Sequence, residues 1–202
     1  VRKGVSSQGT GEVDMFALLK GSFRQNPDYV IVGEVRGKEA SVLFQGMASG
    51  HASISTLHAD SVQAIVNRLS TPPISLSPTL INGLDVVAIQ THAIVGGNET
   101  RRLREIVEVI SVNSDGSSVT NTPFKWNPGD DKFYIHGESK VFEKISSKTG
   151  ISLQELKTEF NIRTKLLYAL YKNKVLSYEE VQKVISEYSK NPRGILQRYG
   201  VT

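Results

Sequence analysis

The 202-residue chain contains no cysteine, so a disulfide scaffold and a thiolate metal site are both excluded. It also has no run of about 18 apolar residues, so we expect no transmembrane segment. Its arginines and lysines do not cluster among aromatic residues, so nucleic acid is not expected as a partner. The lack of cysteine is typical of a cytosolic protein, and the expected location is cytoplasmic.

The composition is that of an ordinary soluble protein, with 39% apolar and 22% charged residues. The formal net charge of +4 is unevenly distributed, because residues 1–112 are balanced and residues 113–202 carry the whole excess. Two explanations stay open for that excess. It is a solvated helix surface, or it is a basic face that lies near anionic lipid or an acidic partner.

A short apolar run, Tyr29 to Val32, predicts a fully buried strand of a parallel sheet. An acid, Glu34, follows the carboxyl end of this run, where open α/β sheets place their ligand chemistry. A second strand is predicted over residues 51–58, with His58 at its far end. A carboxylate and a histidine at the ends of two strands of one sheet would face the same crevice, which suits nucleotide hydrolysis.

Three segments in order resemble motifs of the type II/IV secretion ATPase superfamily. The atypical Walker B segment of that family resembles VIVGEVRGKEA, and its histidine box resembles GHASISTLHAD. Its acidic box and the helix that follows resemble GTGEVDMFALLKGSFRQNPDY. The resemblance extends from about Gly9 through Leu103, and it is nearest to the archaeal branch, which drives pilus and archaellum assembly.

This resemblance implies an ATP hydrolase that uses ATP and Mg²⁺ and works as a homo-hexameric ring. It further implies a membrane platform protein as partner and a peripheral position at the inner face of the cell membrane. The implied activity couples ATP hydrolysis to protein export or filament assembly. The alternative is a non-catalytic scaffold or partner-binding module with the same fold.

The chain contains no G-x-x-x-x-G-K-[ST] string, which P-loop ATPases use to hold phosphates. The nearest string, Gly33 to Lys38, is one residue short, and Glu39 follows it where a metal-binding hydroxyl would stand. In the family that resembles this chain, the P-loop lies just upstream of the acidic box. We therefore expect a C-terminal part of the ATPase that lacks the Walker A loop and is inactive by itself.

The expected fold class is α/β. Residues 1–136 are expected to form the C-terminal part of a RecA-like P-loop ATPase core with antiparallel hairpins at the edge of its sheet. Residues 137–202 are expected to form a small bundle of two or three helices. Capping patterns predict helix starts at Asp14, Asp60, Ser77, Ser152 and Ser177. The hairpin strands are predicted at Val86–Ile94, Leu103–Val112, Ser118–Lys125 and Lys132–His136.

Glu34 is the leading catalytic candidate, because an acid at a strand end can orient or deprotonate the water that attacks the γ-phosphate. The alternative role is a helix-capping or salt-bridged acid. Gly33 would let the backbone approach the phosphates, although it is otherwise a simple turn glycine. For His58 the resemblance implies contact with the γ-phosphate or sensing of its loss, and the alternative is a neutral histidine that bonds a loop carbonyl.

The acidic box contains Glu12 and Asp14, for which the resemblance implies a place near Mg²⁺ or the γ-phosphate. One of the two is expected to be only a helix cap. Arg24 and Arg36 flank the Walker B strand and are candidates for stabilising transition-state charge. The alternative partner of Arg36 is Glu39 on the helix surface.

His51 begins the second predicted strand and would lie about 23 Å from His58 if that strand were extended. One nucleotide does not reach both, so His51 is expected to serve structure or a subunit interface. The same separation argues against shared metal ligation, and we expect no residue that ligates a metal directly.

Overall fold

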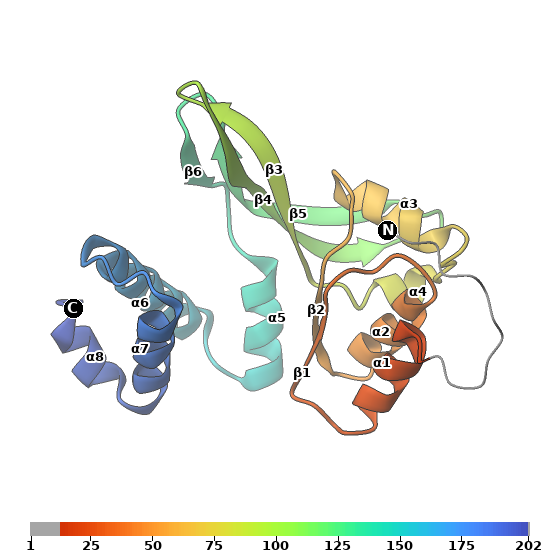
Figure 1. Ribbon diagram of the computed structural model, residues 1–202, viewed down its shortest axis with the longest axis horizontal. Helices are drawn as coiled ribbons and strands as arrows, with labels where there is room; N and C mark the ends of the chain where they lie inside the picture. Colours follow the sequence, from red (N-terminus) through yellow and green to blue (C-terminus); the bar gives the residue numbers. More distant parts are fainter. Residues whose placement is uncertain (1–12, 202) are drawn as a thin grey trace. The chain divides into compact units, whose positions relative to one another are not determined.

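The computed structural model describes residues 13–201 (Figure 1). The chain divides into two compact units, residues 1–139 and residues 140–202. The first unit combines helices with two small sheets, and the second is entirely helical. The chain is therefore a mixed α/β protein with a separate helical part.

The first unit begins with two helix–strand pairs: α1 (Met15–Phe23), β1 (Tyr29–Val32), α2 (Glu39–Ala48) and β2 (Ala52–Ser55). The two strands pair in parallel, from Tyr29 opposite Ala52 to Val32 opposite Ser55. The short helices α3 (Val62–Ser70) and α4 (Pro78–Ile81) follow. Parallel pairing places the carboxyl ends of β1 and β2 at the same edge, and that edge positions the candidate site.

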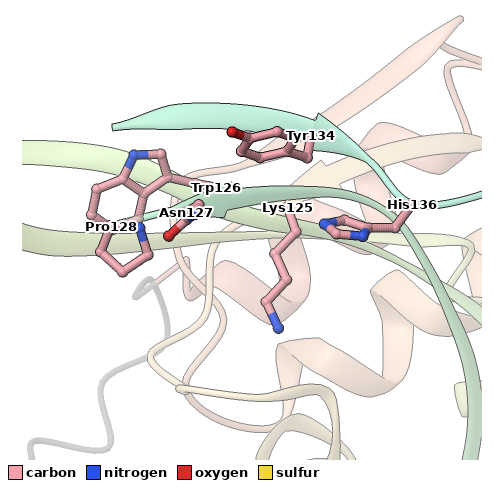
Figure 2. A pocket seen from close by; sticks show the side chains of 6 residues that line it. All are labelled: Lys125, Trp126, Asn127, Pro128, Tyr134 and His136. Carbon is pink, nitrogen blue, oxygen red and sulfur yellow. The ribbon is translucent and has the colours of Figure 1, made fainter. Parts of the chain in front are cut away.

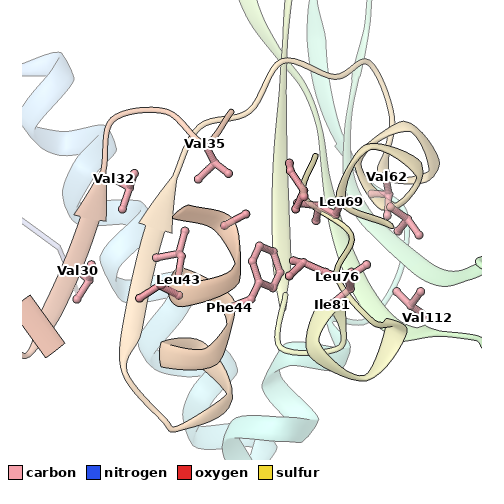
Figure 3. Close-up of a cluster of buried hydrophobic side chains, with 14 of the residues drawn as sticks. Val30, Val32, Val35, Leu43, Phe44, Val62, Leu69, Leu76, Ile81 and Val112 are labelled. Atoms are coloured by element: carbon pink, nitrogen blue, oxygen red, sulfur yellow. The ribbon is translucent and has the colours of Figure 1, made fainter. Parts of the chain in front are cut away.

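β1 is buried on one face only, so the prediction of a fully buried strand is wrong. Val30 and Val32 join the core, whereas Tyr29 is 66% exposed and Ile31 is 74% exposed. Within residues 13–201, the side chains that share the core with β1 include Phe44 of α2 (Figure 3). No described residue covers the opposite face to the same degree, which is why the apolar run alternates instead of being buried throughout.

Most of the predicted helix starts are confirmed by capping geometry. Oδ1 of Asp14 accepts a hydrogen bond from the N–H of Ala17 at 2.7 Å and so caps α1. Ser77 caps α4, which has Pro78 in its first turn. Gly50 has a φ of +95° directly after the end of α2, where a left-handed residue favours glycine.

The expected cap of α3 is wrong by one residue. Ser61, not Asp60, is the cap, and its hydroxyl accepts from the N–H of Ala64 at 3.2 Å. The side chain of Gln63 does not bond back to Asp60, and its amide instead donates to the carbonyl oxygen of Gly116 at 2.8 Å. Two adjacent cap-forming residues left the choice open, and with Ser61 as the cap the third helical residue is Ala64, whose side chain cannot complete a capping box.

Four antiparallel strands form the second sheet in the order β3-β4-β5-β6. They are β3 (Val86–Val95), β4 (Asn98–Val112), β5 (Ser118–Asn127) and β6 (Lys132–Ile135). The predicted hairpins are confirmed, but their predicted place at the edge of the parallel sheet is wrong for residues 13–201. There β2 pairs only with β1, and β3 pairs only with β4, so no backbone ladder joins the two sheets.

The core of the first unit lies between α2, α3, α4 and the first strands of the second sheet (Figure 3). Its most enclosed apolar side chains are Leu43, Val66, Leu69 and Ile81, each 1% exposed or less. Burial of such a side chain stabilises a fold by roughly 1.5–3 kcal/mol. This core therefore holds α2, and with it the loop that carries Glu34, against the second sheet.

The second unit consists of α5 (Lys140–Thr149), α6 (Leu153–Lys172), α7 (Tyr178–Lys190) and α8 (Pro192–Arg198). It has four helices, where two or three were expected. Ser152 and Glu155 form the predicted reciprocal capping box, and Ser177 caps α7. A small separate core contains Leu166, Leu170, Val184, Ile195 and Val201. None of the helices within residues 13–201 combines the length and apolar character that crossing a membrane requires.

Candidate functional site

The structure brings Glu34 and His58 together at the carboxyl edge of the parallel strand pair. Glu34 lies two residues after β1, and His58 lies three residues after β2. Oε1 of Glu34 is 3.3 Å from Nε2 of His58, with the carboxylate partly buried and the imidazole exposed. The sequence patterns predicted that an acid and a histidine would lie together here, and in the structure these two side chains are adjacent.

Arg36 holds the other oxygen of the same carboxylate. Its Nη2 lies 2.5 Å from Oε2 of Glu34. This hydrogen bond is the main cause that lowers the pKa of Glu34; partial burial opposes it, and the charges of Arg36, His58 and Arg68 add to the lowering. Glu34 is therefore ionised at neutral pH. The guanidinium pairs with Glu34 and not with Glu39, the partner considered as the alternative.

Thr56 links the two loops that carry the acid and the histidine. Its hydroxyl donates to the carbonyl oxygen of Gly33 at 2.5 Å, and its own carbonyl accepts from the N–H of Val35 at 3.0 Å. These two hydrogen bonds bracket Glu34 on both sides along the chain. They fix the separation of the two loops independently of the side chains that meet between them.

Two arginines donate hydrogen bonds to backbone carbonyls of the loop after β2 that carries His58, which we name the histidine loop. Nη1 of Arg68, on α3, donates to the carbonyl oxygen of His58 at 2.9 Å. Nη2 of Arg104, on β4, donates to the carbonyl oxygen of Asp60 at 2.5 Å. Arg104 also pairs with Glu105 at 2.9 Å. Sequence analysis missed the roles of both arginines, because they bind backbone carbonyls across the fold and no local pattern marks such contacts.

The loop from Gly33 to Lys38 does not present its amides as an open phosphate cradle. Oε1 of Glu39 accepts from the N–H of Arg36 at 2.6 Å and from that of Gly37 at 2.8 Å. Burial raises the pKa of Glu39, but the backbone donors lower it by more, so the net shift is downward. A carboxylate thus occupies the position that an anion would take, as expected for a string that departs from the P-loop pattern.

The remaining candidates lie outside the Glu34–His58 pair. Asp14 is engaged as the cap of α1, and Glu12 lies outside the described residues. Within residues 13–201, the exposed side chain of Arg24 forms no hydrogen bond or ion pair with Glu34 or His58. A Cβ at Gly33 would meet no atom within 4 Å, so packing within the described structure does not require a glycine at this position.

His51 stands apart from the site, at the start of β2. Its ring packs edge-on against Phe23, with 5.0 Å between the ring centroids. Its Nδ1 is buried without a hydrogen-bond partner in the described structure. Its predicted role at a subunit interface stays a prediction.

A shallow hollow lies on the β5–β6 hairpin and shares no residue with the candidate site (Figure 2). Its lining consists of Lys125, Trp126, Asn127, Pro128, Tyr134 and His136. Among residues 13–201, no group of three or more histidine, aspartate or glutamate side chains is arranged to hold a metal ion.

Residues 3–121 match the family model of the type II/IV secretion system protein. Because this match covers more than half of the chain, the chain belongs to that family. The resemblance seen in the three sequence motifs is thereby confirmed at the level of the superfamily.

Several relatives show the same kinship. An uncharacterized protein of Methanocaldococcus jannaschii is 38% identical over 184 residues, which cover 91% of this chain and 68% of that protein. A second uncharacterized protein of the same organism is 31% identical, over 91% of this chain and 34% of its own length. Type II secretion system protein E of Klebsiella pneumoniae is 40% identical over 81 residues, or 37% of this chain and 16% of that protein.

The chain thus spans about two thirds of the first relative and about a third or less of the other two. Among solved structures, that of the ATPase DotB of Yersinia pseudotuberculosis aligns with a TM-score of 0.35 and 14% sequence identity. The alignment covers 83% of this chain and 39% of that chain, and the likeness is too low to define the fold.

Proposed function

We propose that the Glu34–His58 edge is the water-activating part of an ATP hydrolase that powers protein secretion or filament assembly. The observation that carries this proposal is the 3.3 Å approach of the histidine to the carboxylate at the carboxyl edge of two parallel strands. Ligand chemistry in open α/β sheets gathers at this edge. Membership of the type II/IV secretion system family favours a nucleotide as the ligand at this edge.

The carboxylate of Glu34 has one oxygen that Arg36 does not hold. Its Oε1 is buried and accepts no hydrogen bond in the described structure, although Nε2 of His58 lies 3.3 Å away. Arg36 occupies Oε2 and keeps the group ionised. Once the exposed imidazole of His58 turns toward a bound phosphate, Oε1 would accept a hydrogen bond from the attacking water, orient it toward the γ-phosphate and take its proton.

His58 would contact the γ-phosphate from the opposite loop. Its imidazole is exposed, and Arg68 fixes the backbone of His58 by donating a hydrogen bond to its carbonyl oxygen. Mg²⁺ bound to ATP neutralises phosphate charge, and such an ion needs only one or two protein carboxylates beside phosphates and water. In the described structure Arg36 occupies Oε2 of Glu34 and Oε1 is buried beside His58, so the phosphates and water, and not Glu34 directly, would hold this ion.

The assembly in this proposal is a homo-hexameric ring at the inner face of the cell membrane, with a membrane platform protein as its partner. Closed rings use heterologous interfaces, in which different surfaces of neighbouring subunits meet. Residues 1–136 would be the C-terminal part of the RecA-like core and residues 137–202 its helical appendage. His51 would then act at a subunit contact, apart from the Glu34–His58 pair.

A second candidate function is a partner-binding module without activity. The observation that favours it concerns Glu39, whose carboxylate accepts hydrogen bonds from backbone amides of the loop from Gly33 to Lys38. The sequence contains no other string similar to a P-loop. Hydrolysis therefore needs a phosphate-binding loop that these 202 residues do not contain.

The test is the Glu34→Gln variant in a polypeptide that joins these residues to a G-x-x-x-x-G-K-[ST] loop. Glutamine keeps the shape of the side chain but accepts no proton, so ATP binding should persist and turnover should fall at least about a hundredfold. Glu99→Gln, a change at an exposed carboxylate on β4, is the matched control. Wild-type turnover in Glu34→Gln would reject the hydrolytic role and favour the non-catalytic module.

A further inference from the structure

The helical unit contains a long stretch of one charge sign. Residues 140–202 hold twelve lysines and arginines against six aspartates and glutamates. The excess is concentrated in residues 160–178, which include Arg163, Lys165, Lys172 and Lys174 and no acidic residue. This stretch covers the second half of α6 and the turn into α7.

The same stretch exposes large apolar and aromatic side chains. Tyr171 is 67% exposed and Tyr178 is 73% exposed, and three neighbours are also exposed. Together these five residues form what we name the 167–178 patch: Leu167, Tyr168, Tyr171, Leu176 and Tyr178. The core of the unit does not need them, because it is built from Leu166, Leu170 and residues of α7, α8 and the C-terminal end.

Helical spacing makes the α6 part of this patch continuous. Leu167 and Tyr171 are four residues apart, and Tyr168 and Tyr171 are three apart, so they lie on one face of α6. The ammonium group of Lys172 lies 4.9 Å from the centroid of the Tyr168 ring. Lys174 follows in the turn, and no carboxylate pairs with Lys172 or Lys174 in the described structure.

Two of the three acidic residues nearest in sequence are already engaged, and the third, Glu179, is exposed and forms no ion pair with Lys172 or Lys174 within residues 13–201. Glu159 pairs with Arg163 at 2.7 Å and accepts from the hydroxyl of Tyr188. Glu180 accepts a hydrogen bond from the hydroxyl of Ser177 at the start of α7. Because these carboxylates are engaged, they do not neutralise the lysines of the patch.

We propose that the 167–178 patch docks on an anionic lipid surface. Tyrosine suits the boundary between headgroups and acyl chains, because its ring is apolar and its hydroxyl stays hydrated. Lysines beside it keep their ammonium groups among anionic headgroups while their aliphatic stems cover apolar surface. The absence of any acidic residue from 160 to 178 favours an anionic surface over a neutral one. This inference does not depend on the hydrolytic role of Glu34.

The experiment is sedimentation of the 202-residue chain with sucrose-loaded vesicles. One set of vesicles is pure phosphatidylcholine, and the other contains about one third phosphatidylglycerol. The chain should partition onto the anionic vesicles and not onto the neutral ones, and the partition coefficient should fall as salt is raised. Lys172→Ser/Lys174→Ser should lower it by roughly fivefold for each lysine.

The control is Lys183→Ser/Lys190→Ser, which removes the same charge from α7 outside the patch. A smaller loss in this control than in the patch variant supports docking through the patch. Equal losses in the two double variants would show diffuse attraction to the whole unit and would overturn the proposal. All of these residues are exposed, so far-UV circular dichroism should show unchanged folding.

A second measurement reports on insertion directly. Tyr171→Trp places a fluorophore within the patch, and its emission should shift to shorter wavelength when anionic vesicles are added. The native Trp126 is buried in the other unit, and its emission in the unchanged chain gives the background. No shift, or no sedimentation of the wild-type chain with either vesicle, would reject a lipid surface and leave an acidic protein surface as the occupant.

Discussion

Oε1 of Glu34 lies 3.3 Å from Nε2 of His58, and Arg36 holds Oε2 of the same carboxylate at 2.5 Å. The acid is therefore held between two cationic or potentially cationic side chains, one on its own loop and one on the next. Such an arrangement fixes the position of the carboxylate and lowers its pKa, and it leaves Oε1 buried without a hydrogen-bond donor in the described structure.

Arg36→Ala should raise the pKa of Glu34 toward its ordinary value, because the hydrogen bond from Arg36 is the main cause of the lowering. A carboxylate whose pKa is lowered by folding stabilises the fold above its unfolded pKa of about 4.3. That contribution is lost as pH falls through the lower, folded value. The variant should therefore be less stable than the wild type at pH 7 and nearly equal to it at pH 2.

Carboxyl carbon NMR titration measures the pKa, and urea unfolding at the two pH values measures the stability. Lys38→Ala is the control, since this neighbouring lysine forms no side-chain hydrogen bond at the start of α2. An unchanged Glu34 pKa in Arg36→Ala would contradict the pairing seen in the structure.

Arg68→Ala and Arg104→Ala should each loosen the histidine loop, because each removes the donor to one of its backbone carbonyls. Hydrogen–deuterium exchange of the peptide covering residues 56–61 should become severalfold faster in either variant. Arg101→Ala on β4 is a matched control, since its exposed side chain forms no hydrogen bond or ion pair in the described structure. Exchange as slow as in the wild type would show that the loop is held without the arginines.

By itself, the 202-residue chain should bind ATP weakly and hydrolyse it negligibly. The reason is physical: the amides of Arg36 and Gly37 are occupied by the carboxylate of Glu39, and no other phosphate-binding string is present. Isothermal titration calorimetry measures the affinity. A submicromolar dissociation constant would show that the loop from Gly33 to Lys38 does hold phosphates after all.

The sequence predicted the local features of the fold well, because they depend on near neighbours along the chain. The helix caps at Asp14 and Ser77 follow from short-range hydrogen bonding. The meeting of Glu34 and His58 was also predictable, since parallel strands share a carboxyl edge.

The features that the sequence did not predict depend on contacts between distant residues. Ser61, and not the predicted Asp60, caps α3. The side chain of Gln63, which was expected to take part in that cap, instead donates to the carbonyl oxygen of Gly116. Arg68 and Arg104 donate hydrogen bonds to backbone carbonyls. Because every residue has such a carbonyl, no sequence motif predicts these contacts. The exposure of Ile31 depends on which elements cover the sheet, and an apolar run gives no information about that.

The most direct test of the account is a double-mutant cycle between Glu34 and His58 in a polypeptide that supplies the phosphate-binding loop. Steady-state ATP hydrolysis is measured for the wild type, Glu34→Gln, His58→Ala and the double variant, with ADP affinity measured in parallel. If both side chains act on the same water and γ-phosphate, each single change lowers kcat, and the double variant loses little more than the worse single one. ADP affinity should stay nearly constant, because ADP lacks the γ-phosphate. Fold losses in kcat that multiply, or equal losses of ADP affinity in both single variants, would contradict a shared hydrolytic site.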